Sequence, residues 1–232
     1  MGRGYGMKRE IVFDTETTGM DPAKGHKIVE IGCVEIVNFV PTGRTFHHYI
    51  NPERDVPAEV VAVHGLTGDF LSDKPPFVEI AADLVEFIGE APLVAHNAGF
   101  DMKFLNAELV ACGFRAYESS RVVDTLGLAR RKAPGAPASL DALCKRFGID
   151  NSNRTLHGAL LDARLLADVY LELSGGRQAG LVLEENAETS VSDSQAVRVQ
   201  RPPRSHAPNE AELAAHNVFL KQIKDPLWDK LV

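Results

Sequence analysis

Residues 10–19 read Glu-Ile-Val-Phe-Asp-Thr-Glu-Thr-Thr-Gly, an apolar run that ends in acidic and threonine residues. Short apolar runs of this kind are typical of buried strands. A strand turns residues two apart to the same face, so it would present the carboxylates of Asp14 and Glu16 together. Carboxylate oxygens suit hard cations such as Mg²⁺, although the pair alone fits an ordinary polar strand end equally well. The stretch therefore predicts a strand with a candidate metal site at its end.

Two further strand-like segments follow at residues 28–37 and 45–50, with Pro41-Thr42-Gly43 as the expected turn between them. Three strands joined by short turns predict an antiparallel meander. The pattern then alternates between helical stripes, around residues 77–88, 101–112, 139–147 and 166–173, and short buried strands at residues 93–95 and 121–124. The fold class predicted is α/β, with a mixed sheet (antiparallel meander plus parallel strands) flanked by helices.

The composition divides the chain into four parts. Residues 1–6 resemble a tag remnant or an upstream start and are excluded from the fold. Residues 7–176 form the predicted folded domain. Residues 177–211 are rich in Gln, Glu, Ser, Arg and Pro, which predicts a flexible linker. Residues 212–232 regain apolar side chains, Trp228 among them, but are too few to fold alone, which indicates a segment that docks on a partner.

The chain is acidic, with 25 Lys and Arg against 32 Asp and Glu and a formal net charge of −7. This balance excludes a protein that holds nucleic acid by a broad basic surface. No apolar run approaches the roughly 18 residues of a membrane-spanning helix, and the N-terminus lacks the apolar core of a signal peptide. We therefore expect a cytoplasmic protein without a membrane partner. Three widely spaced cysteines, Cys33, Cys112 and Cys144, favour buried free thiols.

Two more acidic positions and one histidine stand where a predicted element begins. Asp101 opens the helix after the strand at 93–95, where a carboxylate also complements the helix dipole. His157 and Asp162 lie five residues apart, a spacing that on a regular helix turns them about 140° from each other. They can share a site only if His157 lies in the loop before the helix, which Gly158 favours. A histidine there suits a general base.

Three strings of residues, in this order, resemble the three exonuclease motifs of the DEDDh family of 3′–5′ exonucleases: Asp14-Thr-Glu-Thr-Thr-Gly19, His96-Asn-Ala-Gly-Phe-Asp101 and His157-Gly-Ala-Leu-Leu-Asp162. Within this family, the segments Val63-His-Gly65 and Ser139-Leu-Asp-Ala-Leu-Cys-Lys-Arg-Phe-Gly look most like the proofreading epsilon branch of bacterial DNA polymerase III. The resemblance covers residues 7 to about 176 well and the remainder loosely. It implies a ribonuclease H-like exonuclease fold.

The resemblance also implies the roles of the site residues. Asp14, Glu16 and Asp162 would bind two divalent cations, Mg²⁺ or Mn²⁺, Asp101 would complete the carboxylate set, and His157 would be the base. Besides these metal ligands, five residues are expected to contact the substrate: Thr15, Glu59, His64, Asn97 and Phe100.

Two of the substrate contacts have a simpler reading. Glu59 fits a solvated carboxylate as well as a contact with the terminal nucleotide. Phe100 fits core packing as well as a wedge that separates terminal bases. The reaction implied is removal of mispaired 3′-terminal nucleotides from a single-stranded or frayed DNA end, released as 5′-monophosphates.

The resemblance implies two protein partners. Residues 178–183, Gln-Ala-Gly-Leu-Val-Leu, are similar to peptides that dock on the sliding clamp, with Gln178, Leu181 and Leu183 as contacts, but they lack a terminal Phe and also fit an ordinary linker. Residues 212–232 would bind the polymerase alpha subunit. Two alternatives stay open: an RNA-directed exonuclease of the same family, and a non-catalytic subunit that braces the polymerase. The net charge disfavours a lone DNA-binding module.

Overall fold

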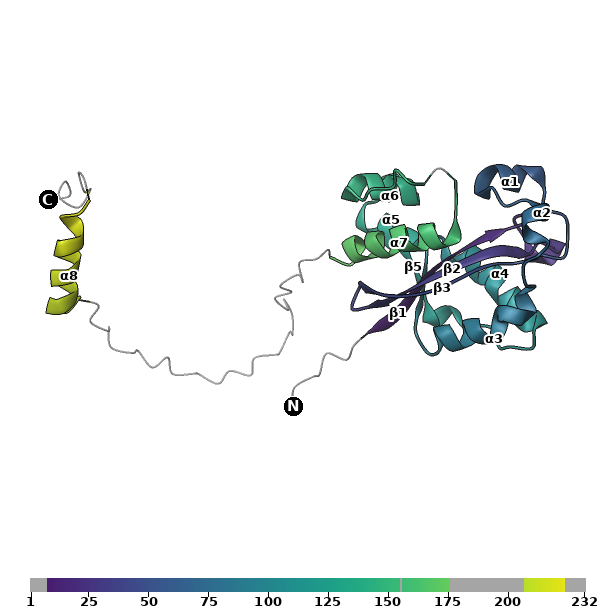
Figure 1. Cartoon of the computed structure of the whole chain (residues 1–232), viewed down its shortest axis with the longest axis horizontal. Helices are drawn as coiled ribbons and strands as arrows, with labels where there is room; N and C mark the ends of the chain where they lie inside the picture. The colour runs from purple at the N-terminus through teal and green to yellow at the C-terminus, as the bar shows by residue number, and fades with distance from the viewer. Residues whose placement is uncertain (1–7, 155, 176–206, 224–232) are drawn as a thin grey trace, which may run out of the picture. The chain divides into compact units, whose positions relative to one another are not determined.

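The computed structural model describes residues 8–154, 156–175 and 207–223 (Figure 1). The chain forms two compact units, residues 1–181 and 182–232, which are described separately. The predicted N-terminal tag at residues 1–6, the clamp-like peptide at residues 178–183 and Trp228 lie outside the described residues. Within the described ranges, no helix has both the length and the apolar character to cross a membrane.

Three antiparallel strands form one half of a five-stranded sheet, as predicted. They are β1 (Arg9–Thr17), β2 (Ile28–Val37) and β3 (Val40–Tyr49). β1 lies next to β2 with Asp14 opposite Gly32 and Glu16 opposite Glu30. The strand β1 therefore runs through both acidic residues and keeps their side chains on one face.

The turn between β2 and β3 differs from the prediction. It consists of Asn38 and Phe39, which have φ angles of 50° and 67°, and Val37 pairs with Val40 directly across it. Two consecutive positive φ angles are typical of a tight hairpin whose twist matches that of the strands. The predicted turn at residues 41–43 lies inside β3 instead. Pro41 predicts a turn from the sequence, but β3 is an edge strand, where a missing N–H is tolerated.

Two parallel strands complete the sheet. β4 (Leu93–Ala95) pairs with β1, and β5 (Val122–Asp124) pairs with β4, which gives the strand order β3-β2-β1-β4-β5. The mixed sheet of the prediction is confirmed. The expectation that residues 121–124 are buried is wrong, because β5 is an edge strand whose residues are half-buried or exposed.

Helices cover both faces of the sheet (Figure 1). The four predicted helices are present as α3 (Phe77–Ile88), α4 (Ala98–Ala111), α6 (Leu140–Phe147) and α7 (Ala159–Leu173). As predicted, the Ser139 hydroxyl caps α6 by accepting the Ala142 N–H. The central strand β1 is buried on both sides, since Ile11 and Phe13 pack with α3 and α4 while Val12 packs with α7.

Three helices were missed by the periodicity of the sequence: α1 (Ala58–His64), α2 (Gly68–Leu71) and α5 (Thr125–Lys132). α1 buries only His64, and α5 buries only Thr125 and Ala129, so neither carries an apolar stripe. α2 has four residues, too few to show a period. Short 3₁₀ turns occupy Pro22–Lys24 and Ser119–Arg121.

The three cysteines are free thiols, as expected. Cys33 and Cys144 are buried in the core, and burial raises the pKa of both thiols. Cys112 is only half-buried, in contrast to the prediction, because it follows the last residue of α4 at the surface end of the helix.

The C-terminal unit contains α8 (Glu210–Leu220). Its first turn carries a capping box in which the Asn209 side chain accepts the Glu212 N–H and the Glu212 carboxylate accepts the Asn209 N–H. The helix begins two residues inside the predicted linker. Leu213, Val218 and Phe219 are exposed on it, and no residue of α8 is buried.

Gly32 of β2 sets the distance between the sheet and α7. A Cβ atom at this position would lie 2.2 Å from the Leu160 nitrogen and 2.4 Å from the Ala159 carbonyl carbon, both backbone atoms of the first turn of α7. Substitution Gly32→Ala must therefore move the helix. We expect it to lower the free energy of unfolding by about 1–3 kcal/mol, measured by urea denaturation.

Gly68→Ala is the matched control, because a Cβ at Gly68 meets no atom within 4 Å. Equal stability of the two variants would contradict the close packing of α7 on β2.

Candidate active site

The alternation of β1 decides which helix each side chain at its end meets. Val12 faces α7, so Asp14 and Glu16, two and four residues further on, face α7 as well. Thr15 lies on the opposite face, with Ile11 and Phe13, toward α4. One strand thus presents polar groups to helices on both sides of the sheet.

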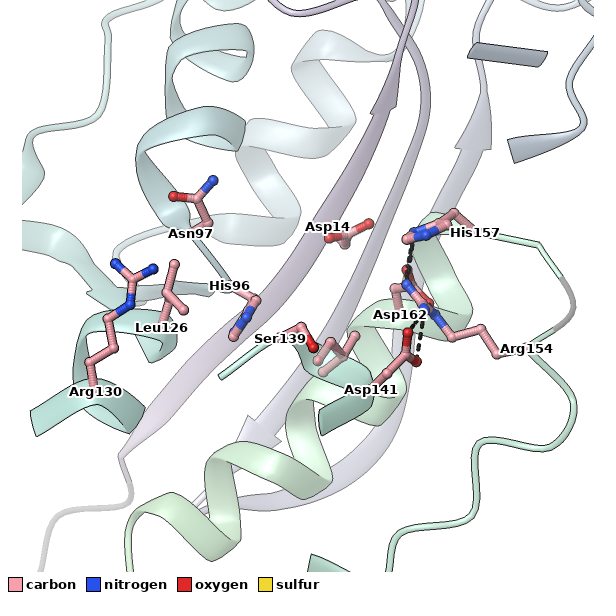
Figure 2. Close-up of a pocket in the computed structure, with 11 residues that line it drawn as sticks. Asp14, His96, Asn97, Leu126, Arg130, Ser139, Asp141, Arg154, His157 and Asp162 are labelled. Atoms are coloured by element: carbon pink, nitrogen blue, oxygen red, sulfur yellow. Dashed lines mark hydrogen bonds and ion pairs between the residues drawn. The ribbon is translucent and has the colours of Figure 1, made fainter. Parts of the chain in front are cut away.

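Asp162 meets the carboxylates of β1 from the first turn of α7. The helix begins at Ala159 after Gly158, so His157 lies in the preceding loop, as the spacing of the two residues required. The His157 N–H donates to the Val63 carbonyl at 3.1 Å, which ties this loop to α1. Asp162 is buried, whereas the His157 side chain is 48% exposed (Figure 2). The arrangement leaves an imidazole at the mouth of an acidic site.

Three side chains could hold one ion. Glu16, His157 and Asp162 each offer a ligand atom, and these atoms lie within 4.8 Å of one another. Carboxylate oxygens and an imidazole nitrogen form a donor set that divalent cations accept. Asp14 is half-buried against the same site and lines the pocket beside Asp162 (Figure 2). The residues present therefore fit a divalent metal.

Asp101 enters from the other face of the sheet. It lies in the first turn of α4, is buried, and accepts two hydrogen bonds on Oδ1: from the Thr15 N–H at 3.1 Å and from the Thr15 hydroxyl at 2.7 Å. The hydroxyl of Thr15, predicted to contact the substrate, is thus engaged with Asp101. Its role in the structure is to hold this carboxylate against the end of β1.

Burial and mutual repulsion raise the pKa values of these carboxyl groups. Desolvation is the largest cause for Asp14, followed by the charges of Asp101 and Glu16, and its pKa lies well above the ordinary value. Desolvation and the charge of Asp162 raise the pKa of Glu16 to about 8. Desolvation raises the pKa of Asp101 to about 7, although the hydrogen bonds from Thr15 oppose the shift. A bound cation would reverse this balance and favour the ionised forms.

One arginine already lies among these groups. Arg154 donates to both oxygens of Asp162 and to both oxygens of Asp141, and its charge lowers the pKa values of Asp14 and Glu16. Sequence analysis does not select Arg154 as a site residue. Its only signal was its place three residues before His157.

The site opens into a pocket of about 560 Å³ (Figure 2). It is lined by residues of β1, α5, α6 and α7 and of the segments before α4 and α7: Asp14, His96, Asn97, Leu126, Arg130, Ser139, Leu140, Asp141, Arg154, His157 and Asp162. Its volume falls within the range usual for small-molecule sites. Arg130 and Asp141 were also missed, because α5 has no apolar stripe and Asp141 reads as an ordinary first-turn acid.

The remaining predicted substrate contacts lie around the site. Asn97 is exposed at the pocket, where it has a φ of 61° and precedes α4. Glu59 is exposed on α1 and lines a separate hollow of about 420 Å³ with Thr18 and His26. His64 is buried at the end of the same helix.

Phe100 does not line the pocket. It packs against Phe104 within α4, with ring centroids 5.1 Å apart, and lies partly buried against the main core. The structure thus gives Phe100 the packing contact that its sequence context also allowed.

Comparison with known proteins places these features in a family. A family model described as Exonuclease matches residues 11–170. A DNA polymerase III subunit epsilon from Rickettsia felis is 50% identical over 221 residues, which span 93% of this chain and 96% of that protein. The DNA polymerase III subunit epsilon of Escherichia coli (strain K12) is 43% identical over 229 residues, with 93% of each chain covered.

Solved structures agree on the fold. Exonuclease X in complex with 5′ overhanging duplex DNA is 29% identical with a TM-score of 0.56, covering 72% of this chain and 90% of that one. The nuclease domain of 3′hExo, a DEDDh family member bound to rAMP, has a TM-score of 0.62 at 19% identity and covers 75% of this chain and 96% of its own. The ribonuclease H-like architecture expected from the resemblance is confirmed.

The raised pKa values predict how stability depends on pH without metal. A carboxyl group whose pKa is higher in the folded than in the unfolded chain stabilises the fold below its unfolded pKa, and this contribution is lost as the pH rises through its folded pKa. For Glu16 the window runs from its ordinary pKa of 4.5 to about 8. In chelator, the free energy of unfolding should fall across it by about 1.4 kcal/mol per pH unit for this group.

Thermal denaturation between these limits measures the effect. Saturating Mg²⁺ should flatten the profile, and Glu16→Gln should reduce its slope in chelator because the amide does not ionise, while the raised pKa values of Asp14 and Asp101 keep part of the slope. A profile in chelator that rises with pH would contradict the assigned shift.

Proposed function

This chain belongs to the exonuclease family and, through relatives that match along nearly its whole length, to the epsilon subunits of DNA polymerase III; on that premise we propose that it is the proofreading 3′–5′ exonuclease subunit of a bacterial replicative polymerase. The observation that carries the proposal is the meeting of Glu16, Asp162 and His157 in one donor cluster, with the half-buried Asp14 and the buried Asp101 beside it. These are the residues of the three motifs.

We assign the metal ligands to the acidic end of β1 and the first turns of two helices. Asp14, Glu16 and Asp162 would hold two divalent cations, Mg²⁺ or Mn²⁺, with Asp101 completing the set. Bound there, such ions supply Lewis-acid polarisation of the scissile phosphate. Thr15 supports the set by fixing the Asp101 carboxylate through two hydrogen bonds.

His157 is the proposed general base. Its ring lies at the mouth of the site, within hydrogen-bonding range of Asp162, and its loop is held by Val63. The imidazole would accept the proton of the attacking water while the bond between phosphorus and the 3′-oxygen of the penultimate nucleotide breaks. The product is a nucleoside 5′-monophosphate. The released 3′-oxygen takes up a proton, so the shortened strand ends in a 3′-hydroxyl.

The terminal nucleotide would lie between the pocket and α1. Glu59 and His64 on α1 and Asn97 at the pocket rim are the proposed contacts. Selectivity for mispaired ends would come from fraying, because a mismatched terminus costs less to unpair. Phe100 packs against Phe104 within α4, so we do not include it among the proposed contacts with the terminal bases.

Two partners are proposed from the C-terminal part of the chain. The exposed apolar residues of α8, together with the apolar residues up to Leu231, would bind the polymerase alpha subunit. Residues 178–183 would bind the sliding clamp through Gln178, Leu181 and Leu183. Such an assembly operates in the cytoplasm of a bacterium, where we place the protein.

Removing the base should slow hydrolysis without emptying the metal site. His157→Ala is expected to reduce turnover by at least about 100-fold, while Asp14→Ala should abolish nearly all of it with the fold retained. Single-turnover assays on single-stranded DNA in Mg²⁺ measure both, and circular dichroism checks the fold. Wild-type rates in either folded variant would remove that residue from the site and leave the bracing-subunit alternative stronger.

Mispaired ends should be degraded faster than paired ones. We expect primer–templates with a terminal mismatch to lose nucleotides at least about tenfold faster than matched ones, because unpairing differs by a few kcal/mol. A single-stranded RNA of the same sequence as the DNA is the control for the RNA-directed alternative. Equal rates on paired and mispaired ends would contradict proofreading, and a preference for RNA would favour the alternative.

Two variants should each lose the binding of one protein partner and keep the binding of the other. A chain ending at residue 205 should retain nuclease activity and clamp binding but fail to co-elute with alpha. The full chain with Gln178→Ala and Leu181→Ala should bind alpha and lose at least about tenfold in clamp affinity. Binding of alpha by the truncated chain, or unchanged clamp affinity of the double variant, would show that the assigned segment is ordinary linker.

A further inference from the structure

The guanidinium of Arg154 lies between the carboxylates of Asp162 and Asp141. Its Nε donates to Asp162 Oδ1 at 2.5 Å, and its Nη2 donates to Asp162 Oδ2 at 2.6 Å, so the planar fork spans the whole carboxylate (Figure 2). Nη1 donates to both oxygens of Asp141 at 2.9 and 3.0 Å. The side chain is only 8% exposed. A buried monovalent cation therefore neutralises the residue that the proposed metals require.

The same arginine fixes the state of the imidazole. Nη2 lies 2.7 Å from His157 Nδ1. A guanidinium can only donate, so Nδ1 must accept, and the ring proton of a neutral imidazole then resides on Nε2. The approach of Nδ1 to Asp162 Oδ2, at 3.3 Å, is longer and joins two acceptors that share the Nη2 donor. In this arrangement the guanidinium occupies the Nδ1 lone pair of His157.

We propose that Arg154 is a displaceable counter-cation: metal binding at Asp162 expels the guanidinium from its place against Asp162 and His157. The inference rests on the proposed metal site and deepens it. Arg154 acts through Asp162 and His157 and is a positioning residue.

Competition follows from shared ligands and from charge. Two of the three side chains in the donor cluster, Asp162 and His157, are bonded to Arg154. A divalent ion among the same atoms would lie beside a like charge with little water between them, a repulsion that burial strengthens. Arg154 takes one lone pair on each oxygen of Asp162, so a metal bound there would have to use the remaining lone pairs beside the guanidinium charge.

Asp141 gives the displaced arginine a place to go. It lies in the first turn of α6, its side chain is 59% exposed, and it binds Arg154 through a nitrogen that does not touch Asp162. The guanidinium can swing toward the pocket rim while this ion pair is kept. Release therefore costs only the contacts with Asp162 and His157.

Nitrogen-15 NMR of the wild-type chain observes the exchange directly. The Nε–H signal of Arg154, assigned by its loss in Arg154→Lys, should be protected from solvent exchange in chelator. Saturating Mg²⁺ should shift it toward the position of an exposed arginine and speed its exchange by at least about tenfold. A signal that keeps its position and protection in Mg²⁺ would overturn the proposal and leave Arg154 as a fixed clamp between α6 and α7.

Metal titration provides the second measurement. Arg154→Gln should bind Mn²⁺ at least about fivefold more tightly, the lower end of usual coupling between two bound groups. Calorimetry at one pH for both chains measures the two affinities. Arg146→Gln removes an equal charge from the exposed face of α6 and should bind as the wild type does. Equal or weaker binding by Arg154→Gln would overturn the proposal.

Both readouts are independent of nuclease activity. If Arg154→Gln does not fold, the wild-type NMR titration still decides between exchange and a fixed clamp. Release of the arginine in a chain that degrades no DNA would uphold the exchange and refute the proposed function. Normal degradation of DNA with an immobile arginine would support the proposed function and refute the exchange.

Discussion

Repulsion among buried carboxylates is the constraint on which the site depends. Asp14, Glu16, Asp101 and Asp162 are brought together with little water around them; desolvation raises the pKa of Asp14, Glu16 and Asp101, and neighbouring charges add to the shift for Asp14 and Glu16. Such a cluster persists only if it binds protons or cations. Arg154 supplies one positive charge from within the chain, and the proposed divalent ions would supply more. Binding of protons or cations thus offsets the negative charge that the fold concentrates at this site.

The central strand makes this concentration of charge feasible. β1 is buried on both faces, so one face can deliver Asp14 and Glu16 to Asp162 on α7 while the other delivers Thr15 to Asp101 on α4. Gly32 lets the first turn of α7 approach the neighbouring strand closely. The apolar core and the acidic site are therefore both built from β1, α4 and α7, and a shift of α7 disturbs both.

The acidic motif and the long amphipathic helices could be predicted from the sequence because period and burial coincide there. The alternation of Asp14 and Glu16 and the loop position of His157 follow from strand and helix geometry alone. The hairpin at Asn38 and Phe39 could not be predicted, since neither Pro nor Gly marks it. α1 and α5 were missed because they bury almost nothing. Arg154 was missed because it lies in a loop, where no helix or strand period predicts which groups its side chain meets.

The edges of the sheet limit how this protein can associate. β3 carries Pro41 and an irregular register against β2, and β5 is three residues long. Long, regular, unpaired strands invite addition of a strand from another chain, and both edges here lack that character. The sheet is thus protected against edge-to-edge aggregation. A partner that adds a strand therefore finds no long, regular edge on this sheet to extend.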